Sequence, residues 1–259
     1  MSFAIIVFVA GVAYTLSAIA SFFEKTSRFA LPIAFVGFVA QFNGLLTRSV
    51  EIGAIPTGSP YELLEVIVCI FAGTQLAFSL LKRNIHTGTF SMLPIALLTL
   101  LPFGCPLFIQ TLQTSNTSAV ASAKGLHALL AALSYACMGA SACFGIMYLR
   151  QKKSLREKSS GGKFLPALET LSATVALCIE IAFFAMIISI AIGLWVSLKA
   201  DSNFFELRSI KFIAATILLI IQTIVYILVV SNCVHGTRLA KVAIGMAVFA
   251  CLLLVPIQI

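Results

Sequence analysis

Charged side chains are scarce in this chain of 259 residues. Asp, Glu, Lys and Arg make up 10% of it and hydrophobic residues 60%, whereas a soluble domain carries about 25% charged residues. So little charge cannot cover a water-facing surface, which excludes one or two soluble domains. The composition is also too apolar for a disordered chain, and 16 Gly with 8 Pro are too few for collagen. An integral membrane protein is the class that is left.

Eight long apolar runs predict eight membrane-spanning helices. A helix needs roughly 20 residues to cross a hydrocarbon core about 30 Å thick. We therefore expect an all-α integral membrane protein, folded as a polytopic bundle in a single domain, residues 1–259. The first run has no basic residue before it, which is atypical of a signal peptide. The expected spans are 3–23, 29–47, 60–81, 89–112, 127–149, 170–198, 211–232 and 242–258.

Prolines interrupt the fourth run. Pro94, Pro102 and Pro106 fall within 89–112, and a proline inside a helix removes a backbone hydrogen bond. We expect this helix to be kinked or partly unwound in its outer half, although prolines that serve only packing are common in membrane helices.

Basic residues are divided unevenly between the two sides of the predicted bundle. The chain has 17 Lys and Arg against 9 Asp and Glu, a net charge of +8. In a soluble protein this excess would suggest nucleic acid, but here we expect no nucleic-acid partner. Twelve of the 17 lie in segments that follow an odd-numbered run, and these segments share one side of the membrane. The positive-inside rule makes this the cytoplasmic side of a cell (inner) membrane. Both termini are then extracytoplasmic. The five basic residues on the outer side are Arg48, Lys124, Lys199, Arg208 and Lys211.

Six of the inner basic residues gather in the segment 150–165. This segment also contains Ser-Ser-Gly-Gly, which is typical of a flexible linker. Anchoring of the topology explains its charge, and contact with anionic lipid headgroups is a second interpretation.

Cysteines and carboxylates inside the runs are the next candidates for chemistry. No two of the seven cysteines form a Cys-x-x-Cys motif, so we interpret them as small buried hydrophobic residues. Ionisable groups are costly inside a membrane. Glu180 lies within the sixth run, where a proton- or substrate-binding group and a locally hydrogen-bonded, neutral side chain are both open. Glu62 and Glu65 begin the third run, and we expect them to be interfacial.

Two of the three histidines lie at predicted helix ends. His127 opens the fifth run at the outer face, and His235 follows the seventh run at the inner face. An imidazole there can ligate iron, carry a proton or bind headgroups. The pattern alone favours a structural or interfacial role.

An ordered set of short motifs covers the second half of the chain. A His precedes Leu-Ser-Tyr-Ala in 126–153, a Leu-Glu-x-Leu start and a Gly-x-Trp end bound 168–198, and His-x-x-Arg closes 226–241. Together they resemble the membrane core of the cytochrome c assembly family, which includes CcsA-type haem-handling proteins and HemX-like proteins. Pro60-Tyr61-Glu62 is similar to the Tyr-Glu start of a helix in CcsA-type members.

The resemblance implies a haem site. His127 matches the family's outer axial ligand to haem iron, His235 matches a His at the inner end of a helix, and the outer loop is where members hold haem. Here the loop 199–211 has Phe204 and Phe205 in place of a Trp-Asp motif, and no His follows His235. The chain is thus closer to a HemX-like or divergent CcsA-like member. Candidates for stacking on the porphyrin are Trp195, Phe204 and Phe205, and candidates for pairing with propionates are Lys199, Arg208 and Lys211.

Three functions are compatible with these patterns. The first is a haem-handling membrane protein of cytochrome c biogenesis, which presents haem at the outer face to an assembly partner. The second is a HemX-like regulator or scaffold that contacts a tetrapyrrole-synthesis enzyme, and the third is a proton-coupled transporter that uses Glu180. No nucleotide loop, zinc signature or Ser-His-Asp pattern is evident, so we do not expect an enzyme that acts alone, although a component of a cytochrome c synthase is possible.

Overall fold

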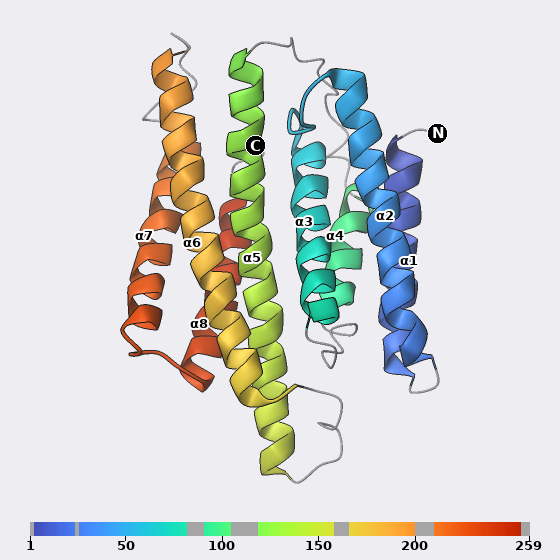
Figure 1. The fold of residues 1–259 in the computed structure, drawn as a ribbon, viewed down its shortest axis with the longest axis vertical. Helices are drawn as coiled ribbons and strands as arrows, with labels where there is room; N and C mark the ends of the chain where they lie inside the picture. The colour runs from blue at the N-terminus through green and yellow to red at the C-terminus, as the bar shows by residue number, and fades with distance from the viewer. Residues whose placement is uncertain are drawn as a thin grey trace. The chain divides into compact units, whose positions relative to one another are not determined.

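The chain is helical throughout the part that the structure describes. The computed structural model describes residues 3–23, 26–81, 91–104, 119–157, 166–199 and 210–254, which form eight helices and no strand (Figure 1). Six of them are long and apolar enough to cross a membrane. The predicted all-α membrane bundle of eight helices is therefore confirmed. The helices are α1 (Phe3–Phe22), α2 (Ser27–Ile52), α3 (Pro60–Leu81), α4 (Leu93–Gly104), α5 (Ala119–Arg156), α6 (Leu168–Lys199), α7 (Ile210–Val230) and α8 (Thr237–Leu254).

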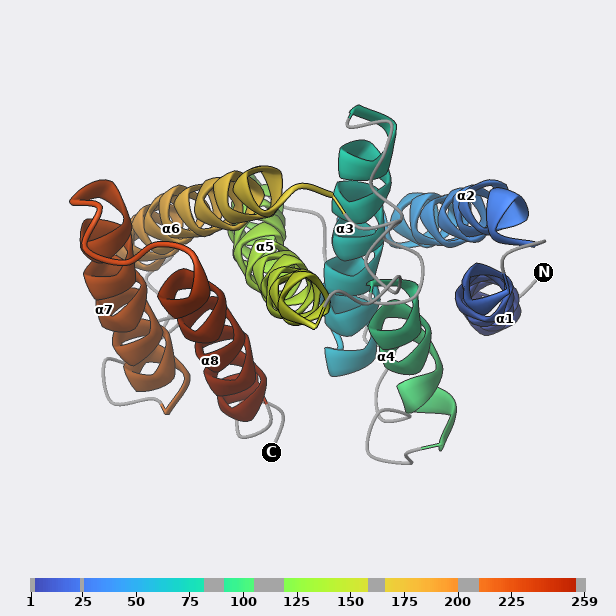
Figure 2. The ribbon, with the colours of Figure 1, turned by 90° about the horizontal axis from the view of Figure 1, so that it is seen from below.

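The helices fall into two compact units, Met1–Gly125 and Leu126–Ile259. In the first unit α1 packs along α2 and α4, and α3 packs on both α2 and α4 (Figure 2). Gly37 on α2 lets α1 come close, because a Cβ at this position would lie 3.1 Å from the side chains of Ala13 and Tyr14. Small residues allow such close approach between membrane helices, where lipid provides no hydrophobic drive for association.

Local signals define the connection between α2 and α3. Gly53 follows α2 with φ of 66°, the left-handed conformation that commonly ends a helix. Pro60 is the first residue of α3, where its missing N–H costs nothing. The Ser59 hydroxyl accepts a hydrogen bond from the Glu62 amide at 3.2 Å and so caps the helix.

In the second unit α6 packs on α7 and α8, and α7 packs on α8. Helix α5 approaches α8 at Gly145, where a Cβ would lie 2.9 Å from the backbone oxygen of Ala240. Between α7 and α8 the chain reverses through Asn232 and Gly236, both with positive φ.

Several boundaries differ from those expected. Helix α5 begins at Ala119, so His127 lies about two turns inside the helix and does not open it. The same helix continues to Arg156, so the first half of the expected linker 150–165 is helical, and residues 158–165 lie outside the described part. Helix α4 covers only the middle of the run 89–112; it contains Pro102 and ends at Gly104, and residues 105–112 lie outside the described part.

Candidate functional site

Part of the predicted haem site lies outside the described residues. This holds for Phe204, Phe205 and Arg208, and for the side chains of Lys199 and Lys211. Stacking on the porphyrin by the two phenylalanines and pairing of the three basic groups with propionates therefore stay predictions.

Trp195 and His235 are described, and both are exposed. Trp195 lies in the last turns of α6 with 56% of its surface exposed. His235 lies in the turn before α8, with Nδ1 3.3 Å from the Asn232 carbonyl oxygen. It lines an open cavity of about 430 Å³ together with Tyr148, Lys152 and Arg238.

The structure separates His127 from His235 along α5. The cavity that His235 lines includes Lys152, which lies 25 residues after His127 on the same helix. That separation corresponds to about 38 Å at 1.5 Å per residue. The two imidazoles are therefore not brought together, and they cannot ligate one iron.

His127 is held by Ser189 of α6. Its Nδ1 lies 2.7 Å from the backbone oxygen of Ser189 and 3.0 Å from the Ser189 hydroxyl, which in turn donates to the His127 carbonyl at 2.8 Å. Because a carbonyl oxygen only accepts, Nδ1 carries the proton and donates it. In the neutral ring this tautomer has its lone pair on Nε2.

The contact at His127 begins a regular series of hydrogen bonds between helices of the second unit. Seven residues further along α5, the hydroxyl of Ser134 donates to the backbone oxygen of Ala182, seven residues before Ser189 on α6, at 2.8 Å. Gln222 of α7 donates its Nε2 to Ser134 Oγ at 3.1 Å and to Met138 Sδ at 3.2 Å. We name this set, His127, Ser189, Ser134 and Gln222, the neutral seam. The two contacts between α5 and α6 lie seven residues, or about two turns, apart on each helix, and the helices run antiparallel.

A second polar cluster lies in the first unit around Glu65, whose side chain is fully buried. The Tyr14 hydroxyl donates to Gln41 Oε1 at 2.9 Å, and Gln41 Nε2 donates to Glu65 Oε2 at 2.8 Å. These three residues, which come from α1, α2 and α3, form the carboxyl cluster. Glu65 is thus surrounded by α1 and α2 instead of by headgroup water, while its interfacial depth stays a prediction.

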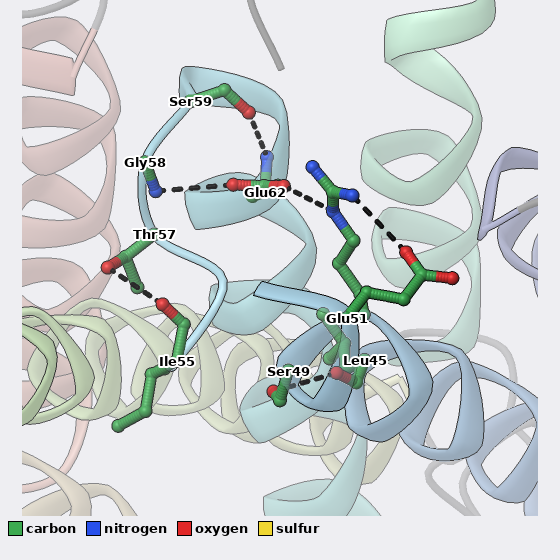
Figure 3. Close-up of polar contacts among 9 residues, drawn as sticks. Leu45, Ser49, Glu51, Ile55, Thr57, Gly58, Ser59 and Glu62 are labelled. Carbon is green, nitrogen blue, oxygen red and sulfur yellow. Dashed lines mark hydrogen bonds and ion pairs between the residues drawn. The ribbon is translucent and has the colours of Figure 1, made fainter. Parts of the chain in front are cut away.

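Glu62 is also buried, and it has an ionic partner. Arg48 of α2 donates from Nε to Glu62 Oε1 at 2.8 Å and from Nη1 to Glu51 Oε2 at 3.2 Å. The other oxygen of Glu62 accepts from the Gly58 amide at 3.2 Å (Figure 3). The carboxylate of Glu62 therefore joins the end of α2 to the start of α3. Its interfacial depth stays a prediction.

Glu180, the carboxylate expected to be the most deeply buried, lies in the middle of α6 and is half-buried. Within the described ranges it forms no hydrogen bond or ion pair. Sequence reasoning ranked it above Glu65 because it is further from a helix end. The missed signal is that Tyr14, Gln41 and Glu65 are polar groups within three successive apolar runs.

The described cysteines are mostly buried, as expected. Cys69, Cys137, Cys143 and Cys178 are buried, whereas Cys233 and Cys251 are exposed, and Cys105 lies outside the described part. Among the described residues, no three His, Cys, Asp or Glu side chains gather closely enough to hold a metal ion. A haem iron held by a single imidazole would not require such a group.

Comparisons with known proteins add no family to this description. No protein-family model matches the sequence, and neither a curated protein nor a solved structure matches it. The resemblance to cytochrome c assembly proteins thus stays a prediction from the motifs around His127, Trp195 and His235.

Proposed function

We propose that this chain is a haem-handling membrane protein of cytochrome c biogenesis, with His127 as the ligand to haem iron. The observation that supports this is the hydrogen bond from His127 Nδ1 to the Ser189 carbonyl. A histidine that binds a metal almost always donates its other ring N–H to a carbonyl, carboxylate or water, which orients the ring and raises its basicity. In the proposed topology this end of α5 faces the extracytoplasmic side of the inner membrane.

The donor set fits a haem that is carried and not permanently enclosed. One imidazole from this chain leaves the other axial position to water, to a partner protein or to His127 of a second copy. His235, near the other end of α5, is too far along the helix to fill that position. Haem would bring the porphyrin that an assembly partner attaches to an apocytochrome, while His127 would hold the iron and Trp195 would offer an aromatic face.

The test is the visible spectrum of the protein purified from cells supplied with haem. We expect a Soret band in the wild type, its loss in His127→Ala, and its partial recovery when free imidazole is added to that variant. His235→Ala is the matched control, because it removes an exposed imidazole near the opposite end of α5, and its Soret band should be retained. A wild type without a Soret band, or a band unchanged in His127→Ala, would falsify the proposal.

A further inference from the structure

The carboxyl cluster of the first unit has no part in the proposed haem function. Glu65 is fully buried and lies six residues into α3, within the part of that helix that is apolar enough to cross a membrane. An ionisable side chain in such a position is costly, and it is retained in membrane proteins chiefly where it has a task.

The direction of the hydrogen bonds indicates the state of this carboxyl group. Since the Tyr14 hydroxyl donates to Gln41 Oε1, the Gln41 amide presents its NH2 group to Glu65, where it bonds one oxygen, Oε2. The other oxygen, Oε1, has no hydrogen-bond partner in the described part of the chain. A buried carboxylate ion requires several donors or a cation around it, and this group has a single amide donor.

The other charged and titratable groups around Glu65 do not supply a counter-charge. Tyr14 of α1 and Tyr61 and Cys69 of α3 are neutral in their ordinary state, and Arg48 of α2 is bound to Glu62 and Glu51. The described residues of α4 include no titratable side chain. Within these residues, a proton on Oε1 is therefore the available means of neutralising Glu65.

A second polar group without a partner lies one helical turn nearer the start of α3. The Tyr61 hydroxyl is buried and has no hydrogen-bond partner in the described part, while its ring makes edge contacts with Phe3 and Phe103 at 5.6 and 6.5 Å between centroids. Residues four apart on a helix are neighbours. Tyr61 is thus a buried polar group without a partner one turn from Glu65, on the side of the α2–α3 connection.

We propose that Glu65 is a proton-binding site, which is neutral at rest and exchanges its proton through Tyr61 with water at the α2–α3 connection. On release the O–H bond of the carboxyl breaks, the proton passes to water by way of the phenol oxygen, and the carboxylate stays on Glu65. Uptake is the reverse. The site belongs to the first unit alone, so it does not depend on haem binding at His127.

Infrared spectroscopy of the full chain in lipid vesicles tests the proposal directly. A protonated carboxyl gives a carbonyl stretch above the amide I band, which shifts to lower frequency in D2O. We expect this band in the wild type at neutral pH and its loss in Glu65→Gln, a neutral variant of the same size that keeps an oxygen for Gln41. Glu180→Gln is the matched control and should keep the Glu65 band.

The role of Tyr61 is tested by the rate of hydrogen exchange. Tyr61→Phe should keep the infrared band but slow its shift after transfer to D2O, and an unchanged rate would overturn the role of Tyr61.

Chemical modification tests the protonation of Glu65. In the wild type, dicyclohexylcarbodiimide should modify Glu65, as mapped by peptide mass spectrometry, in sodium-containing and sodium-free buffer alike. A Glu65 band absent at neutral pH, or a modification that sodium ions prevent, would show a carboxylate or a metal-cation site and would overturn the proposal. His127→Ala should leave all these readings unchanged, which separates this proposal from the haem proposal.

Discussion

The two units of the protein bury polar side chains in different ways. Among the described residues, the buried acidic groups, Glu62 and Glu65, both lie in the first unit. The second unit buries serines, a threonine and glutamines, and joins α5, α6 and α7 through the neutral seam. Neutral hydrogen bonds between membrane helices are individually weak, whereas breaking a buried ion pair leaves a stranded charge.

The two units therefore differ in whether their polar cluster contains a carboxyl group. The carboxyl cluster of the first unit contains an acid, Glu65, which can bind or release a proton. The serine and glutamine side chains of the neutral seam carry no titratable group, so their hydrogen bonds do not depend on a charge of their own. Three substitutions test whether the contrast holds energetically.

The largest effect is expected from Arg48→Ala in the first unit. The Arg48 side chain is 14% exposed and that of Glu62 is 3% exposed, so the substitution leaves a buried carboxylate without its cation. We expect a loss of about 3 kcal/mol in the free energy of unfolding, measured by thermal denaturation in detergent micelles. Glu51→Ala is the control: its side chain is 56% exposed, and its loss should stay within about 0.5 kcal/mol. Equal losses in the two variants would show that the buried Arg48–Glu62 ion pair stabilises the fold no more than the exposed Arg48–Glu51 pair.

A smaller effect is expected in the second unit where α5 meets α8. In Gly145→Ala the new methyl group would lie 2.9 Å from a backbone oxygen of Ala240, and backbone cannot move aside as a flexible side chain can. Overpacking of this kind costs about 1–3 kcal/mol. Gly245→Ala on α8 meets no atom within 4 Å and should instead stabilise its helix by about 0.5–1 kcal/mol. Two destabilised variants would contradict the close packing described here.

The smallest effect is expected from Ser134→Ala in the neutral seam. It removes the bond to Ala182 and one of the two acceptors of the Gln222 amide. Hydrogen bonds between membrane helices average about 0.6 kcal/mol, so we expect a loss of that order in the same denaturation assay. Ser141→Ala removes only a bond to a carbonyl of its own helix and should be nearly neutral. A loss as large as that of Arg48→Ala would end the distinction between the units.

The sequence predicted where the helices lie in the chain better than it predicted which side of each helix is buried. Hydropathy reports whether a segment can enter a bilayer, and the eight apolar runs that it marks overlap the eight described helices, six of which are long and apolar enough to cross a membrane. It carries little information about which side of a helix meets another helix. For this reason Glu180 ranked above Glu65, although α6 leaves Glu180 half-buried while α1 and α2 enclose Glu65.

The position of His127 could be predicted only in part. The motif before Leu-Ser-Tyr identified the residue, but the helix begins about two turns earlier than the expected run because Lys124 and Gly125 interrupt the apolar pattern without ending the helix. The partner Ser189 is 62 residues away in the chain, and no local pattern marks it. Only the antiparallel pairing of α5 with α6 brings the two together.

The length of α5 has a consequence of its own. At 38 residues it measures about 57 Å, against about 40–45 Å for a bilayer including its headgroups. Even at a tilt of about 40°, the upper end of the usual range, its vertical reach of about 44 Å equals the thickness of the whole bilayer with its headgroups. Four exposed basic residues lie at the far end of this helix: Arg150, Lys152, Lys153 and Arg156. One rigid helix therefore has the length to carry these four charges to the headgroups across the usual range of tilts.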